Sequence, residues 1–258
     1  MSDPLDFTAC AALVEKGDPV RFRCTMAAPV AARPVLFPLY AFNLEVARAP
    51  WVTQEPMIAR MRLQWWRDAL EEIAAGGLIR RHEVVTPLAL AIRAEDARVL
   101  DRLIAARERD VDGEAFADEA AFWAYLEATS GGLIEVAARR LGGGETLAMA
   151  AGRALGVANW LMAVPALDRA GRQPLAGLDA AMAAQLADKG LAALREVRAG
   201  WSGVPASARA AFYPLAGIGG VLRRAVSDPQ RVMEDRLEPG QFAARVRLAL
   251  TAGTGRIF

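Results

Sequence analysis

Apolar residues recur at intervals of three and four along most of this chain, and this pattern restricts it to a helical fold. The clearest stripe comprises Ile58, Met61, Trp65, Ala69 and Ile73. Such spacing puts side chains on one face of an α-helix. No run of several residues alternates between apolar and polar, so no pair of strands is expected. We therefore predict one all-α domain over residues 1–258, with nine or ten helices.

Glycine, proline and capping residues divide the remaining pattern into further helices. Asp118 is a predicted N-cap, Gly142–Gly144 a predicted stop and Pro165 a predicted helix end, while Gly131-Gly132 softens one long helix. The expected helices cover roughly Thr86–Arg93, Ala97–Asp110, Asp118–Leu126 continuing into Leu133–Leu141, Glu145–Val164, Ala181–Arg198, Ser207–Val226 and Gln241–Leu250. Residues Arg172–Leu178 are expected to form a loop.

Few residues are available for metal or nucleophile chemistry. The chain has 2 cysteines, Cys10 and Cys24, and 1 histidine, His82. A zinc site of cysteine and histidine is therefore nearly excluded. A histidine-activated nucleophile would need His82, which we expect to be a solvated loop residue. The formal net charge of +1 gives no reason to expect nucleic-acid binding.

The sequence predicts a cytoplasmic protein. Two cysteines suit a reducing compartment, and residues 1–6 have neither the basic nor the apolar region of a signal peptide. The longest apolar run, Val157–Leu167, contains Asn159 and Pro165 and is too short to span a bilayer. Peripheral contact with the inner membrane stays open.

Four stretches together resemble the squalene/phytoene synthase family over roughly Asp18–Val226. They are Arg33 with Leu39–Phe42; the tryptophan-containing Arg62–Leu70; Ala106–Asp112 followed by Phe116 and Tyr125–Thr129; and Gly156–Leu161 followed by Gly171-Arg172 and Leu175. The resemblance implies a single-domain, isoprenoid-synthase-type helical bundle around a central cavity.

Enzymes of that family hold magnesium and prenyl diphosphates with two aspartate-rich motifs on facing helices. The corresponding positions here are Ala47 and Trp51 in the first motif, and Ala163 and Leu167 in the second. None of these side chains offers an oxygen ligand. The departure from the family pattern argues against prenyl transfer and implies no cofactor, with Mg²⁺ expected only if the chain is a divergent enzyme.

The pattern A-F-N-x-E-x-A around Asn43, followed by M-R-L-Q-W-W and L-M-A-V-P, is similar to a non-enzymatic branch of that family. The branch includes a mitochondrial assembly factor for respiratory complex I. The resemblance implies a catalytically inactive protein that assists assembly of NADH dehydrogenase, with complex I subunits or other assembly factors as partners. Two alternatives stay open: a divergent prenyltransferase that condenses prenyl diphosphates head to head, and a protein that binds an isoprenoid or another lipid.

Eight residues are candidates for lining the retained cavity and binding a ligand, and none is assigned a catalytic role. They are Arg33, Tyr40, Asn43, Glu45, Arg62, Trp65, Asp168 and Arg172. The alternative for Tyr40 and Asn43 is a buried hydrogen bond, and for Glu45 an ion pair with an arginine.

Two further expectations concern side chains on helix surfaces. Neighbours on a helix point about 100° apart, so we expect Trp65 in the core and Trp66 in secondary packing. The charged run Arg107–Asp112 is expected to form either a docking patch or a solvated face with ion pairs of little energy.

Overall fold

The amphipathic segments fold into an assembly of packed helices. The structure is a computed structural model that describes residues 6–53 and 55–257. The α-helices are α1 (Thr8–Gly17), α2 (Pro19–Ala27), α3 (Arg33–Arg48), α4 (Pro56–Ala75), α5 (Val85–Ala91), α6 (Ala94–Asp112), α7 (Glu119–Leu126), α8 (Gly132–Leu141), α9 (Ala148–Arg169), α10 (Ala180–Gly200), α11 (Ile218–Ser227), α12 (Gln230–Met233) and α13 (Gln241–Thr254). Shorter helical turns are η1 (Val30–Ala32), η2 (Glu127–Gly131), η3 (Glu145–Leu147), η4 (Trp201–Gly203) and η5 (Arg209–Leu215). No strand occurs within the described residues, which confirms the all-α prediction.

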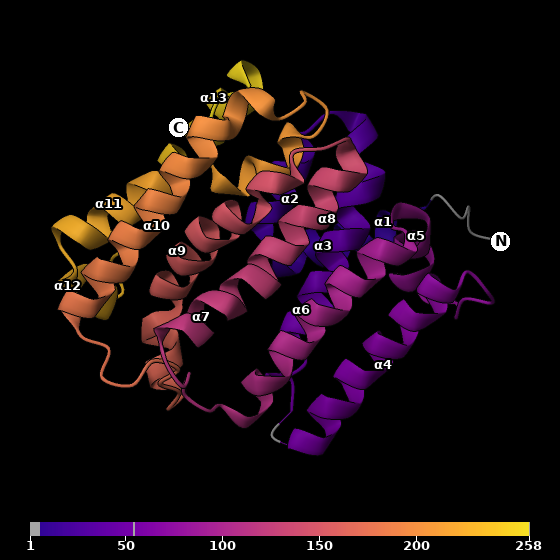
Figure 1. Cartoon of the computed structure of the whole chain (residues 1–258), viewed down its shortest axis with the longest axis horizontal. Helices are drawn as coiled ribbons and strands as arrows, with labels where there is room; N and C mark the ends of the chain where they lie inside the picture. The colour runs from indigo at the N-terminus through magenta and orange to yellow at the C-terminus, as the bar shows by residue number, and fades with distance from the viewer. Residues whose placement is uncertain (1–5, 54, 258) are drawn as a thin grey trace.

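Successive long helices pack side by side across the molecule, from α4 through α6, α8 and α9 to α10 and α11 (Figure 1). Helix α3 contacts α1, α5 and α8. Buried apolar side chains from α1 to Ile257 form one connected cluster. Residues 1–5, which belong to the stretch used for the signal-peptide prediction, lie outside the described part of the chain.

The long helix that was predicted to continue through Gly131-Gly132 is present. Helix α7 runs directly into η2, a π-helical segment, and then into α8. Asp118 caps α7 as predicted, because its side chain accepts a hydrogen bond from the backbone N–H of Ala121 at 2.8 Å. The predicted stop at Gly142–Gly144 is confirmed by left-handed φ values at all three glycines. A π-segment shifts the register of side chains, and this one lies against α9.

The predicted apolar stripe of α4 is wrong in its first half. Ile58 and Met61 are exposed and Trp65 is only half-buried. The buried side of α4 is instead formed by Ala59, Leu63, Trp66, Ala69, Leu70 and Ile73. Two apolar stripes run along this helix, and contact with α6 selects the second.

Other helix boundaries also differ from the predictions. Helix α9 continues through Pro165 to Arg169, although proline removes one backbone hydrogen bond near the helix end. The single helix predicted over Ser207–Val226 is two segments, η5 and α11, because Gly217 takes a left-handed conformation with φ +87° between them. The sequence pattern predicts neither α1 nor α2.

Among the described residues, one helix, η3 with α9, is long and apolar enough to cross a membrane. Its apolar window is 67% buried inside the protein. Its buried residues include Ala151, Ala154 and Val157, and it contacts α8, η2 and α10. These contacts make α9 the central core helix of the fold.

Candidate functional site

A cavity of about 320 Å³ lies among α3, α6, η2 and α9, and we call it the central cavity. Its lining combines charged and aromatic side chains with small residues of the helices. The lining residues are Asp18, Arg21, Asn43, Leu44, Ala47, Trp51, Arg107, Arg109, Asp110, Phe116, Tyr125, Leu126, Thr129, Ser130, Gly156, Asn159, Trp160, Ala163, Leu167 and Pro174. They come from segments that are distant in sequence, so only the folded chain forms this site.

All four positions singled out as lost metal ligands line the central cavity. Ala47 and Trp51 lie at the α3 side, and Ala163 and Leu167 project from α9. Trp51 is 48% exposed, and the guanidinium carbon of Arg172 lies 4.2 Å from its ring centre. Arg172 also donates a hydrogen bond to the backbone carbonyl of Asp110. Trp51 and Arg172 thus stack together where Trp51 borders the cavity.

The acids of the cavity do not fit a magnesium site. Asp18 is bound to Arg21 at 2.6 Å, and Asp110 to Arg107 at 3.2 Å. Magnesium needs oxygen ligands in near-octahedral geometry. Within residues 6–53 and 55–257, no three histidine, cysteine or carboxylate side chains are grouped to hold a metal ion.

A hydrogen-bonded triad forms one wall of the cavity. The Tyr125 hydroxyl donates to Asp110 at 2.7 Å, and Arg107 donates to both Tyr125 and Asp110. Burial raises the pKa of Tyr125, against the opposite effect of the Arg107 charge. The hydroxyl therefore stays protonated and keeps its donor role at neutral pH. One carboxylate is shared by a tyrosine and an arginine, which fixes all three side chains.

Two further arginines are held in place around the cavity. Arg21 lies 5.5 Å from the ring centre of Tyr40, and Arg109 lies 3.5 Å from that of Phe116. Arg109 also donates to the carbonyl oxygen of Glu114 at 2.6 Å. The lining thus carries three guanidinium groups against two carboxylates. This balance suits an anionic group, bound by arginine rather than by metal.

The predicted site residues separate into several places, and Asn43 alone of the eight ligand candidates lines the central cavity. Glu45, Arg62 and Trp65 line a separate groove of about 200 Å³ with Trp66 and His82. Within the described residues Glu45 has no ion-pair partner, so the alternative of an arginine pair is wrong.

Asp168 and Arg172 line a pocket of about 380 Å³ that shares Trp160, Leu167 and Pro174 with the central cavity. The remaining two candidates do not reach any of these spaces. Arg33 donates to the carbonyl oxygen of Met26 at 3.1 Å. Tyr40 is buried in the core beneath Arg21, and burial raises its pKa.

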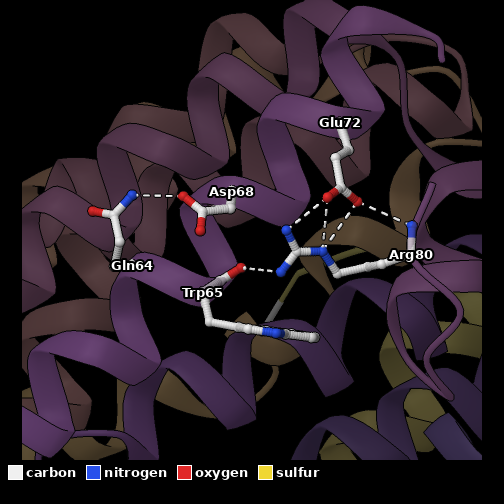
Figure 2. A network of polar contacts seen from close by, with 5 residues as sticks. All are labelled: Gln64, Trp65, Asp68, Glu72 and Arg80. Atoms are coloured by element: carbon white, nitrogen blue, oxygen red, sulfur yellow. Dashed lines mark hydrogen bonds and ion pairs between the residues drawn. The ribbon is translucent and has the colours of Figure 1, made fainter. Parts of the chain in front are cut away.

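The predicted roles of the two tryptophans are reversed. Trp66 is 5% exposed and packs edge-on against Phe42, with ring centres 5.4 Å apart. Trp65 is half-buried, and the guanidinium of Arg80 lies 4.8 Å from its ring centre. Figure 2 shows how Arg80 is held there, by hydrogen bonds to Glu72 and to the backbone carbonyl of Trp65. The Trp65 ring is therefore part of a partly solvated polar network.

His82 is not the freely solvated residue that was predicted. It is half-buried, with its ring centre 5.0 Å from that of Trp65 and 5.6 Å from that of Trp66. Its Nδ1 accepts a hydrogen bond from the backbone N–H of Val84 at 3.1 Å. His82 holds the α4–α5 connection against α4.

The charged run Arg107–Asp112 has two different sides. Glu108 and Asp112 form ion pairs with Arg67 and Arg60 of α4, as expected for a helix surface. Arg107 and Asp110 face the central cavity instead, which neither prediction anticipated. The sequence feature that could have predicted this shared orientation is the spacing of three between Arg107 and Asp110, which places their side chains on one face of a helix.

Comparisons with known proteins identify the fold. The model of the squalene/phytoene synthase family matches residues 14–179. A crystal structure of a dehydrosqualene synthase in complex with ligand superposes with a TM-score of 0.76, covering 98% of this chain and 99% of that one. Their sequence identity is 13%, so this likeness concerns the fold alone.

Two curated relatives are named as complex I assembly factors. NADH dehydrogenase (ubiquinone) complex I, assembly factor 6 homolog of Drosophila melanogaster is 33% identical over 175 residues, which are 64% of this chain and 51% of that protein. Assembly factor 6 of Homo sapiens is 27% identical over 162 residues, or 60% of this chain and 48% of that protein. The chain spans about half the length of these relatives.

Proposed function

Because the chain belongs to the squalene/phytoene synthase family, we propose that it keeps the family fold without the family reaction and assists assembly of respiratory NADH dehydrogenase. The observation that carries the proposal is the lining of the central cavity. The positions that would hold magnesium are Ala47, Trp51, Ala163 and Leu167, and they lie together around one space. Apolar side chains there cannot bind the ions that the family reaction needs.

The names of the relatives support the assembly role, since two of them are complex I assembly factors. The proposed partners are subunits of the dehydrogenase or other assembly factors. The proposed place of action is the cytoplasmic face of the membrane that holds this enzyme. No cofactor is required for such a role.

Exposed apolar side chains after α3 and in the first turns of α4 support a protein partner. Trp51, Val52, Met57, Ile58 and Met61 are all between 45% and 66% exposed. Contiguous apolar surface is uncommon on a monomer unless another molecule covers it, and methionine adapts well to such contacts. The apolar patch of Trp51, Val52, Met57, Ile58 and Met61 is our candidate for the partner-binding surface.

Deletion of the gene tests the assembly role. We expect less fully assembled NADH dehydrogenase on native gels, lower NADH:quinone activity in membranes, and rescue of both by the wild-type gene. The double variant Met57→Glu/Met61→Glu should fail to rescue. Leu78→Glu is the matched control, because Leu78 is an apolar residue 96% exposed just after α4.

Normal assembly in the deletion strain would refute the proposed function. Rescue by Met57→Glu/Met61→Glu would instead leave the function in place and exclude the patch as its partner surface. The two outcomes are distinguishable, because the first compares strains with and without the gene and the second compares variants.

Ligand binding is the second candidate function, favoured by the three arginines of the central cavity. Arg21, Arg107 and Arg109 could hold the head group of an isoprenoid or lipid while the aromatic lining contacts its tail. Calorimetry with farnesyl diphosphate and no metal tests this. Binding that Arg107→Gln weakens would support it, and no heat of binding would exclude this ligand. A divergent prenyltransferase would in addition need magnesium, for which the cavity offers no ligand set.

A further inference from the structure

The C-terminal helix α13 carries an apolar stripe that faces away from the protein. Phe242 is 81% exposed, Val246 40% and Leu250 47%, and their spacing of four places them on one side of the helix. Leu248 and Thr251, on another side, are buried against the protein. The orientation of α13 is further held by the Trp201 indole, which donates to the carbonyl oxygen of Gly255 at 2.6 Å. The stripe is therefore exposed while the helix is fixed in position.

The charges of α13 are exclusively positive. The sequence of the helix, QFAARVRLALTAGT, contains Arg245 and Arg247 and no acidic residue. At 100° per residue, these two arginines project on either side of the stripe. Long basic side chains beside an exposed apolar face are the pattern of a helix that lies in the surface of a membrane.

A basic groove of about 610 Å³ lies between α11 and α13. Arg223, Arg224 and Arg247 line it with Ser227, and no acidic side chain contributes to the lining. Among the described residues, Arg224 and Arg247 bond only backbone carbonyls, those of Gly220, Glu238 and Gly217. Burial, Arg247 and Arg231 lower the pKa of Arg224. Three positive charges therefore share a groove without a carboxylate from the described residues.

The close approach of Arg247 to α11 depends on Gly220. A Cβ atom on Gly220 would lie 2.2 Å from Nη1 of Arg247. The absence of a side chain at this position lets the guanidinium lie across α11 and complete the groove. The basic groove thus lies where Arg247 of α13 packs closely across α11.

We propose that α13 and the basic groove dock on a bilayer that contains anionic phospholipids. Such a surface supplies both complements at once: phosphate groups for Arg223, Arg224 and Arg247, and acyl chains for the apolar stripe. The net charge of the whole chain is only +1, so the attraction comes from local concentration of arginine rather than from total charge.

The location of α13 fits this role. Figure 1 places α13 and the C-terminus at the opposite end of the molecule from the start of α4. The apolar patch of Trp51, Val52, Met57, Ile58 and Met61 would stay free when α13 rests on a membrane. Docking does not rest on the proposed assembly function, since it concerns other residues.

Vesicle flotation of the full chain tests the proposal. Wild-type protein should float with vesicles of phosphatidylcholine and phosphatidylglycerol, and should not float with phosphatidylcholine alone. Binding should weaken as salt is raised. The variant Arg223→Gln/Arg247→Gln should bind roughly tenfold more weakly, and Phe242→Ser/Val246→Ser similarly. The matched controls, Arg98→Gln and Leu78→Ser, change exposed residues elsewhere and should bind as wild type.

Thermal unfolding of each variant separates loss of binding from loss of folding, because the altered side chains are largely outside the core. Absence of wild-type flotation would overturn the proposal, as would equal binding to both kinds of vesicle. Unchanged binding by both the arginine variant and the apolar-stripe variant would also overturn it. A concentration-dependent dimer that Phe242→Ser/Val246→Ser abolishes, without vesicle binding, would assign this face to a second copy instead.

Discussion

At the scale of single residues, stability depends on a few charges that the fold has taken out of water. Asp96 is fully buried and pairs with Arg139 at 2.9 Å, and it accepts the backbone N–H of Arg93 at 3.0 Å. Asp101, on the same helix, pairs with Arg67 at 2.8 Å but is 39% exposed. These two aspartates form similar contacts in different environments.

We predict different costs for the same substitution at these two sites. Asp96→Asn should lower the free energy of unfolding by about 2–3 kcal/mol, because the buried carboxylate loses its charge-assisted hydrogen bonds with Arg139 and the Arg93 N–H, although Arg139 keeps its pair with Glu135. Asp101→Asn should cost less than about 1 kcal/mol, since water already screens that pair. Urea unfolding measures both. Equal costs would contradict the role given to burial.

The thiol of Cys24 gives a prediction about pH. Burial raises its pKa from 9.0 to about 12. A pKa that is higher in the folded state favours the protonated thiol, so its contribution to stability is complete below pH 9 and is lost between pH 9 and about 12. In Cys24→Ala, the fall in the free energy of unfolding above pH 9 should be shallower than in the wild type. The cavity cost of the substitution is the same at every pH, so an identical slope in both proteins would refute the prediction.

At the scale of helices, close packing of glycines positions α9. A Cβ atom on Gly152 would lie 2.4 Å from backbone atoms of Gly131, so α9 can approach η2 only without a side chain there. This contact sets the separation of two elements that form the wall of the central cavity. Gly253 in α13, by contrast, has nothing within 4 Å of such an atom.

Alanine at these two glycines should have opposite effects. We expect Gly152→Ala to lower the free energy of unfolding by about 3 kcal/mol, because backbone must move. Gly253→Ala should raise it by roughly 0.5–1 kcal/mol through helix propensity. Thermal and urea unfolding measure the changes. If Gly152→Ala were as stable as the wild type, the α9–η2 contact would not be as close as described.

The helices also show how far sequence patterns reach. Periodicity with capping and stop residues predicted α6, α10 and α13 to within a few residues. Periodicity did not predict which face of α4 is buried. This helix has two apolar stripes, and only the contact with α6 selects the one that contains Trp66. The left-handed Gly217 similarly divides a segment whose apolar period is continuous.

At the scale of the whole molecule, the four family-motif positions named from the sequence line the central cavity, whereas only Asn43 of the eight ligand candidates does. The resemblance to the family pointed to Ala47, Trp51, Ala163 and Leu167, and all four line one space. It did not reveal that Arg21, Arg107 and Tyr125 line the same cavity, because they come from α2, α6 and α7, which lie far apart in the sequence. Among the described residues, the lining of this cavity carries three arginines and two carboxylates, and each carboxylate is paired with an arginine.

Diphosphate release tests most directly whether this cavity carries out the family reaction. Purified protein would be incubated with magnesium and farnesyl or geranylgeranyl diphosphate, and free diphosphate measured over time. We predict no release above the background without protein, because Ala47, Trp51, Ala163 and Leu167 cannot bind the metal. Release that depends on the protein and stops when a chelator removes magnesium would contradict the loss of catalysis.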